Sequence, residues 1–244
     1  MNFLEYCIVP DWPAPAQVKA LQTTRLGGVS QAPYAQLNLG DHVGDHPLIV
    51  AQNRQRLSAL LPAEPVWLQQ VHGTAVANAD EGSCFIQADA SVARQRGAVC
   101  AVMTADCLPI LLCDQSGTVV AAAHAGWKGL AAGVIETTVQ SMRVEPVQLM
   151  AWLGPAISQR AFEVGAEVRE QFMQHAPQVE QAFIAGANGK WMADIYLLAR
   201  QRLNALGISQ IYGGNFCTYS DAERFYSFRR EGVTGRMGTF VWIE

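Results

Sequence analysis

Short apolar runs alternate along the chain with longer segments in which apolar residues recur at helical spacing. The short runs predict strands at residues 66–71, 98–104, 110–113, 119–124, 148–153, 225–229 and 237–243. The periodic segments predict helices at residues 48–61, 128–142, 161–174 and 192–206, and Gly207 is suited to end the last helix. The glycine-rich residues 232–235 predict a hairpin or a short loop before the final strand.

The order of these elements shows no regular alternation of strand and helix, because several strands follow one another with only short turns. Such an order favours an α+β fold with a mixed sheet over a doubly wound fold. No repeat of solenoid spacing, no low-complexity tract and no linker-like segment interrupts the chain. We therefore expect a single domain over residues 1–244.

The charge and hydropathy of the chain argue against a nucleic-acid or membrane partner. The formal net charge of the 244 residues is −4, so the basic excess that marks nucleic-acid-binding proteins is missing. The N-terminal segment has neither a basic region nor a long apolar region, and no secretory signal is expected. The nearest approach to a membrane span, residues 97–113, is interrupted by Asp106 and Pro109. We expect a cytoplasmic protein without a nucleic-acid or membrane partner.

The six cysteines of the chain do not suggest a disulfide framework. The cytosol keeps thiols reduced, so we interpret most of these cysteines as small residues of the core. There is no C-x-x-C pair, and neither a zinc ribbon nor a thioredoxin motif is therefore predicted.

Three apolar runs are each followed by a side chain that can bind a metal ion. These side chains are His72, Cys107 and His124, and glycine or proline lies close after each of them. The ends of neighbouring strands can converge, and two imidazoles with one thiolate would then form a three-ligand site with an open fourth position. That arrangement is typical of catalytic zinc, which activates water or polarises a substrate atom. For each residue taken singly, a buried structural role is the simpler interpretation.

Basic residues beside glycines are candidates for anion binding. The segment from Gly126 to Gly129 leads from a strand into a helix, whose N-terminus suits an anion, and Lys128 would add a charge. Arg25 precedes a Gly-Gly turn and has the geometry to bind a carboxylate or phosphate. Arg229 and its neighbour Arg230 would point to opposite faces of a strand, so at most one would face a site. A solvated turn or a surface charge is an equally simple interpretation of these features.

At these residues the chain closely resembles the YfiH family, also called multicopper polyphenol oxidoreductases or laccase-domain proteins. The matching segments, in chain order, are TRLGGVS (24–30), LNLG (37–40), QVHG (70–73), ADA (88–90), TADCLP (104–109), HAGWKG (124–129), LGPAI (153–157), FEVG (162–165), CTY (217–219) and YSFRR (226–230). The resemblance covers nearly the whole chain. It implies an α+β fold in which mixed β-sheets are layered with helices.

The resemblance also implies a metal and an activity. His72, Cys107 and His124 would be the ligands of Zn²⁺, with Cu²⁺ as the alternative metal. The implied activity is cleavage of adenosine, inosine or methylthioadenosine by phosphate, which gives the free base and a ribose 1-phosphate. Adenosine deamination and the correction of peptidoglycan precursors that carry a wrong amino acid are further activities linked to the family.

Residue roles follow as hypotheses. Cys107 and His124 are expected in the catalytic centre, and Asp89 or Asp106 would act as general base or orient a ligand. Substrate or phosphate binding is assigned to one further set of residues: Arg25, Asn38, Lys128 and Arg229. Purine nucleosides and phosphate are the expected partners, and the sequence leaves the oligomeric state open.

Three other functions remain open. A copper polyphenol oxidase matches the ligand types, but five histidines without a His-x-His pair are too few for a multicopper centre. A metal-free thiol hydrolase would use Cys107 as nucleophile and His124 as base, which suits amide chemistry on peptidoglycan precursors. A non-catalytic module could present the tryptophans of the chain as a binding surface, although it would leave the histidines and Cys107 without a role.

Overall fold

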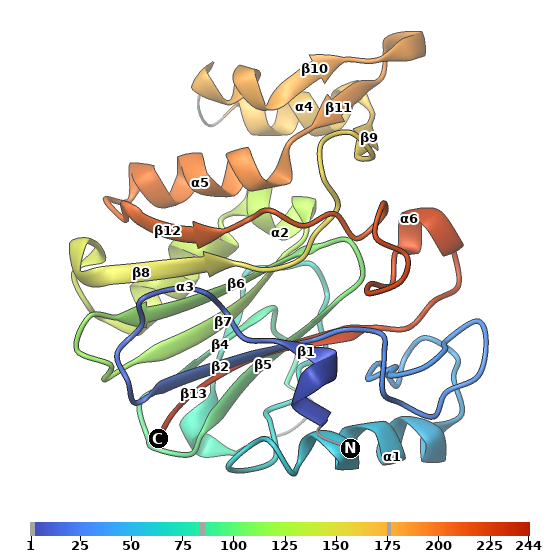
Figure 1. The fold of residues 1–244 in the computed structure, drawn as a ribbon. Coiled ribbons are helices and arrows are strands. Elements are labelled where there is room, and N and C mark those ends of the chain that lie inside the picture. Colours follow the sequence, from blue (N-terminus) through green and yellow to red (C-terminus); the bar gives the residue numbers. More distant parts are fainter. Residues whose placement is uncertain (1–2, 83–85, 175–176) are drawn as a thin grey trace.

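Two β-sheets stacked face to face occupy the centre of the molecule (Figure 1). The structure is a computed structural model, and it describes residues 3–82, 86–174 and 177–244. Within these residues, an antiparallel sheet of order β1-β2-β13-β5 comprises β1 Cys7–Ile8, β2 Val18–Thr23, β5 Val99–Thr104 and β13 Met237–Ile243. A mixed sheet of order β12-β8-β6-β7-β4-β3 comprises β3 Val76–Asn78, β4 Ala90–Ala93, β6 Leu108–Asp114, β7 Val120–Ala125, β8 Leu149–Leu153 and β12 Gln210–Gly213.

A small antiparallel sheet and the helices complete the layers. The small sheet, of order β10-β11-β9, comprises β9 Glu163–Val164, β10 Phe183–Ala185 and β11 Trp191–Ala193. The α-helices are α1 Pro47–Leu57, α2 Trp127–Ala132, α3 Val134–Met142, α4 Ala166–Met173, α5 Ile195–Ala205 and α6 Phe228–Glu231. Figure 1 shows α1 beyond one central sheet and α5 beyond the other, with α4 and the small sheet furthest out.

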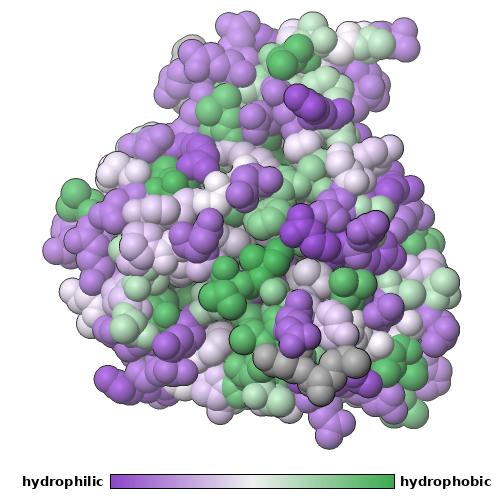
Figure 2. Space-filling view, viewed as in Figure 1, coloured by the Kyte–Doolittle hydropathy of each residue, from purple (hydrophilic) through white to green (hydrophobic). Residues whose placement is uncertain are grey.

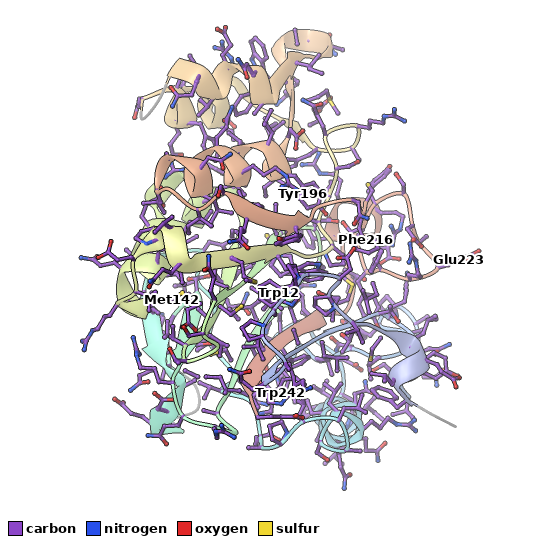
Figure 3. All side chains as sticks on the ribbon, turned by 60° about the vertical axis from the view of Figure 1, so that its left-hand side comes forward. Trp12, Met142, Tyr196, Phe216, Glu223 and Trp242 are labelled. Atoms are coloured by element: carbon purple, nitrogen blue, oxygen red, sulfur yellow. The ribbon has the colours of Figure 1, made fainter. Side chains whose placement is uncertain are left out.

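Both faces of the central strands are buried, which explains their uninterrupted apolar sequences. In β6, Leu111 and Cys113 face the core between the two sheets, whereas Ile110 and Leu112 face the core beneath the helices. A strand that is buried on both faces reads as a continuous apolar run rather than as an alternation of apolar and polar residues. The same core between the sheets receives Trp12 from the N-terminal loop (Figure 3).

The predicted α+β class with mixed sheets and helical layers is confirmed. Helix boundaries differ from the prediction where local chemistry decides them. Gly133, with a φ of +103°, divides residues 128–142 into α2 and α3. The last long helix begins only after Asp194, whose side chain accepts the Leu197 N–H at 2.9 Å as an N-cap. Gly165 precedes α4, and the residues before it form a turn and β9.

Two predicted strands are absent from the described chain. Residues 66–71 make only isolated bridges, from Val66 to Cys100 of β5 and from Gln69 to Gln87. Further along, the Gln70 side chain binds the Met103 backbone N–H and C=O in place of a strand partner. Residues 225–227 lead into α6, which begins at Phe228, and the Ser227 hydroxyl accepts the Arg230 N–H as an N-cap. The apolar pattern there reflects the complete burial of Phe225 and Tyr226 in a loop.

Tyr196 fixes α5 against the loops that follow β8 and β12. Its hydroxyl accepts the Ala156 N–H at 2.8 Å and lies 3.0 Å from the carbonyl oxygen of Gly154 and 3.2 Å from that of Phe216. Figure 3 shows Tyr196 and Phe216 close together at this junction. The visible face in Figure 2 is mostly hydrophilic, with apolar residues gathered near its centre. None of the helices in the described part of the chain has the length and apolarity needed to cross a bilayer.

Candidate metal centre

The three predicted metal-binding side chains lie together at one end of the stacked sheets. Cys107 lies in the turn between β5 and β6, His124 lies near the end of β7, and His72 lies in the loop before β3. Because Pro109 of β6 is the register partner of His124, the thiol and the imidazole lie at the same edge of the sheet. The ligand atoms of these three residues, here called the ligand trio, all lie within 4.8 Å of one another.

Asp89 supports both histidines of the ligand trio. Its Oδ1 atom lies 2.8 Å from His124 Nδ1 and accepts the His72 N–H at 2.9 Å. Its Oδ2 atom accepts the N–H groups of Val71 at 3.1 Å and Gly73 at 2.7 Å. Burial alone would raise the pKa of Asp89, but the hydrogen bonds from His124 and Gly73 outweigh burial and lower it.

The backbone at His72 is shaped around this carboxylate. His72 has a φ of +60°, a left-handed conformation that is uncommon for a residue with a side chain. In this conformation the consecutive N–H groups of Val71, His72 and Gly73 converge on Asp89, as backbone N–H groups do in anion-binding nests. Asp89 therefore positions His72 through its backbone and His124 through its ring, and it leaves His124 Nε2 directed away from the carboxylate.

Cys107 differs chemically from the other described cysteines of the sheets. Burial disfavours its thiolate, but the charge of His124 and hydrogen bonds from both histidines outweigh burial and lower the pKa of Cys107 to about 6. Burial likewise disfavours the charged form of His124, yet Cys107 and Asp89 raise the pKa of His124 to about 9. By contrast, burial raises the pKa of Cys100 and of Cys113 to about 12, as expected for inert core thiols.

The donor set and the space around it fit one metal ion. Two imidazole nitrogens and a thiolate are the ligands of a three-coordinate protein site that leaves a fourth position to water or substrate. Gly126 lies against all three ligands, and a Cβ atom there would lie 2.9 Å from His72 Cδ2 and 3.0 Å from Cys107 Sγ. In the described parts of the chain, the ligand trio is the only group of three such side chains with this spacing, so it accounts for one metal ion and not for several.

A cavity of about 390 Å³ opens beside the ligand trio. It is called the site cavity below. Its apolar lining consists of Met103, Ala105, Trp127, Ile157, Phe162 and Phe228. Its polar lining, besides the ligand trio, consists of His42, Gln70, Thr104, Asp106, Arg229 and Arg236. A volume of this size suits a small-molecule ligand.

Of the predicted binding residues, Arg229 is the one that lines the site cavity. Its guanidinium group lies 5.8 Å from the centre of the Phe162 ring. Arg25 lies elsewhere, where it pairs with Glu231 at 2.8 Å and stacks on Tyr226. Lys128 is exposed beside the Trp127 ring and does not line the cavity.

Asn38 is fully buried and is used by the backbone around it. Its Oδ1 atom accepts the N–H groups of Gly40 and Arg236, each at 2.9 Å, and its Nδ2 group donates to the Gly40 carbonyl and to Asp45. Asn38 was predicted to contact a ligand, but it does not line the site cavity and instead binds the backbone N–H of Arg236.

The carboxylate of Asp106 is directed at α6 and not at the histidines. Oδ1 accepts the Thr218 hydroxyl at 2.6 Å, and Oδ2 accepts the Ser227 hydroxyl at 3.0 Å and the Arg229 N–H at 2.7 Å. Asp106 has a φ of +87° and immediately precedes Cys107, so the same turn presents the thiol to the site and anchors α6.

Sequence reasoning missed several residues of the site cavity, among them His42, Thr104 and Arg236. Arg236 directly precedes the last strand, next to Gly235, and no motif marks it. Thr104 ends an apolar strand and reads as part of the core. Only the pairing of β5 with β13, in which Thr104 is the partner of Met237, brings these two regions together.

The fold and the site define an α+β protein with a two-histidine, one-cysteine group at the end of stacked sheets. A family model described as multi-copper polyphenol oxidoreductase laccase matches residues 19–244, and the chain belongs to this family. A Pseudomonas aeruginosa protein named purine nucleoside phosphorylase is 56% identical over 238 residues, which cover 97% of this chain and 98% of that protein. Purine nucleoside phosphorylase YfiH of Escherichia coli is 55% identical over 239 residues, with 97% and 98% covered.

A solved structure supports the same assignment. The crystal structure of a Neisseria meningitidis protein of the DUF152 family model superimposes with a TM-score of 0.94 at 50% sequence identity. The superposition covers 98% of this chain and 99% of that chain. The layered arrangement is therefore shared over the full length of a relative.

Proposed function

We propose that the chain is a zinc-dependent purine nucleoside phosphorylase that acts on adenosine, inosine and methylthioadenosine and also deaminates adenosine. The observation that carries the proposal is a ligand trio placed in a cavity whose remaining lining combines aromatic and cationic side chains. The names of relatives that share more than half of their residues with this chain support the same substrate class.

The aromatic lining suits a purine base. Trp127, Phe162 and Phe228 contribute rings to the site cavity, and flat apolar rings stack favourably on a nucleobase. Phe228 is 57% exposed although it is large and apolar, which is the expected state of a side chain that a ligand covers.

Phosphorolysis requires two ligands side by side. An oxygen of phosphate forms a bond to C1′ of the ribose while the bond between C1′ and the base nitrogen breaks, and the released base takes up a proton. Deamination instead replaces the amino group at C6 of adenosine with an oxygen from water and releases ammonia. Both reactions need the purine held in a fixed orientation and negative charge stabilised at its edge.

The chain supplies the support for this chemistry. A zinc ion held by the ligand trio would act as a Lewis acid with an open fourth position. Asp89 fixes the orientation and tautomer of His124, and its oxygens already accept four hydrogen bonds, so we assign it a positioning role. Asp106 holds α6, and through it Phe228 and Arg229, at the site cavity.

The test is an assay of purified protein with inosine or adenosine and phosphate, in which the products are separated by chromatography. We expect free base and ribose 1-phosphate, loss of both after chelation, and recovery with zinc. His72→Ala and Cys107→Ala should be inactive, whereas Cys217→Ala, a cysteine outside the ligand trio, should keep its activity. Wild-type protein that releases no base with zinc present would refute the proposal.

A second candidate function, that of a cysteine hydrolase, rests on the order in which three side chains contact one another. Cys107, His124 and Asp89 follow one another as thiol, imidazole and carboxylate, which is the arrangement of a cysteine hydrolase. Such an enzyme would cleave amide bonds, as in the editing of peptidoglycan precursors. Activity on an amide substrate that survives complete metal removal and requires Cys107 would favour this candidate over the zinc enzyme.

A further inference from the structure

Arg236 is a cation in the site cavity that has no carboxylate partner among the described residues. Its Nη1 group donates to the carbonyl oxygens of Thr234 and Gly235, each at 3.0 Å. Its Nε and Nη2 groups form no hydrogen bond within the described chain, and no described carboxylate lies within ion-pair distance. Six other arginines differ, since ion pairs join them to acidic residues: Arg25, Arg54, Arg169, Arg202, Arg224 and Arg230.

Thr104 adds an independent sign of a missing ligand. The residue is 1% exposed, and its Oγ1 atom is buried without a hydrogen-bond partner in the described structure. Thr104 lines the same cavity as Arg236, and its register partner Met237 is the next residue after Arg236. Because the Oγ1 atom has almost no accessible surface, a ligand oxygen in the cavity reaches it only after the Thr104 side chain turns about its Cα–Cβ bond. A hydrogen bond to that oxygen would then relieve the cost of an unpaired buried hydroxyl.

The backbone around Arg236 holds its side chain in place. Asn38 Oδ1 accepts the Arg236 N–H at 2.9 Å and also the Gly40 N–H at the same distance. A Cβ atom at Gly40 would lie 2.8 Å from Arg236 Cγ, so only glycine leaves room for the stem of this arginine. The segment of residues 37–40 therefore positions Arg236 from behind and does not itself line the cavity.

The geometry points to an oxyanion subsite in which the Arg236 guanidinium and the Thr104 hydroxyl bind inorganic phosphate beside the ligand trio. The identity of the oxyanion rests on the proposed phosphorolysis, whereas the subsite itself rests on the unpaired donors. A guanidinium group offers parallel N–H donors that match two phosphate oxygens, and the hydroxyl donates to a third. The aromatic part of the site cavity is then left for the purine.

Direct binding of phosphate to the zinc-loaded protein, measured by isothermal titration calorimetry, tests the subsite. We expect Arg236→Gln to weaken phosphate binding by about tenfold to a hundredfold, because a charge-assisted contact is lost. Thr104→Val should weaken it by about threefold to tenfold. Gly40→Ala, which keeps the charge but displaces the arginine stem, should also weaken phosphate binding. Arg96→Gln, which removes an exposed arginine outside the site cavity, is the matched control, and it should change phosphate binding by less than about threefold.

Steady-state kinetics give the second readout. The KM for phosphate should rise in Arg236→Gln while the KM for inosine stays near the wild-type value. Thermal melting checks that each variant is folded. If Arg236→Gln does not fold, Arg236→Lys replaces it as the test, because lysine keeps the charge but lacks the paired donors. We expect Arg236→Lys to bind phosphate more weakly than wild type and more tightly than a variant without the charge.

The outcomes separate this subsite from the proposed function. A folded Arg236→Gln protein that binds phosphate as well as wild type overturns the subsite, even if nucleosides are cleaved. Equal losses in Arg96→Gln and Arg236→Gln also overturn it, since general charge would then suffice. A wild-type protein that cleaves no nucleoside but binds phosphate through Arg236 would refute the proposed function and support the subsite.

Discussion

Asp89 is the residue on which the geometry of the ligand trio depends most. Its carboxylate holds the His72 backbone in a left-handed conformation and the His124 ring through Nδ1. Both histidines therefore depend on the same carboxylate. Loss of one charge should therefore disturb two ligands at once.

We expect Asp89→Asn to lower the affinity for zinc by about tenfold to a hundredfold, the usual effect of losing a carboxylate that supports metal-binding histidines. An amide oxygen cannot accept all four hydrogen bonds with full charge, and the amide N–H₂ would face backbone donors. Zinc affinity would be measured by competition with a chromophoric chelator.

The matched control is Asp80→Asn. Asp80 also accepts backbone N–H groups, those of Arg94 and Gln95, but it contacts no residue of the ligand trio. Equal zinc affinity in Asp89→Asn and wild type would contradict the positioning role of Asp89.

The titration of the Cys107–His124 pair predicts how metal binding depends on pH. Between about pH 6 and about 9 the pair carries one proton, because the pKa of Cys107 is lowered and that of His124 is raised. A bound metal requires a thiolate and a neutral imidazole, so this proton must be released. Affinity for zinc should therefore rise with pH across this interval and level off above it.

Calorimetry of zinc binding at about pH 8 in buffers of different ionisation enthalpy would count the released protons. We expect about one proton per zinc ion from the pair. Binding without proton release at this pH would mean that the thiol and the imidazole are not coupled as described.

The ligand trio was within reach of sequence reasoning, and Arg236 was not. His72, Cys107 and His124 each lie at the end of an apolar run, so that convergence of these ends could be expected. For His72 the expected strand is absent, and Asp89 positions the residue instead. Arg236 acts at the site because β13 pairs with β5 across most of the chain length, which no local pattern reveals. Arg25 could bind an anion, but it lies outside the site cavity and its guanidinium group is paired with Glu231.

At the scale of elements, α6 is the part of the site that sequence patterns misrepresent. Residues 225–229 are apolar enough for a strand, yet Asp106 binds the Ser227 hydroxyl and the Arg229 N–H and so fixes the start of a short helix. A contact between residues so far apart in the chain overrides local propensity. The result is that Phe228 and Arg229 stand at the site cavity.

Phe228→Ala should raise the KM for purine nucleosides by about fivefold to fiftyfold, because a stacking ring worth about 1–3 kcal/mol is removed. The KM for phosphate should stay near its wild-type value. Folding should be little affected, since Phe228 is largely exposed. Tyr219→Ala, which removes another partly exposed aromatic ring outside the cavity lining, is the control, and equal kinetic effects of both variants would contradict the assigned purine position.

At the scale of the whole molecule, two stacked sheets place their strand ends so that side chains from distant segments meet. The α+β class was predictable from the order of strands and helices. The small sheet of β9, β10 and β11 was not, because its strands are short and two of them lie in segments that read as helix starts. That residues 1–244 fold as one unit, located in the cytoplasm, stays a prediction.

The central claim is that one zinc ion on the ligand trio supports nucleoside cleavage. The most direct measurement is a titration of metal-free protein with zinc while release of free base from inosine and phosphate is followed. The account predicts that activity rises in proportion to added zinc and stops at about one ion per chain, with no such rise in Cys107→Ala. Full activity in the metal-free protein, or activity that copper restores and zinc does not, would contradict it.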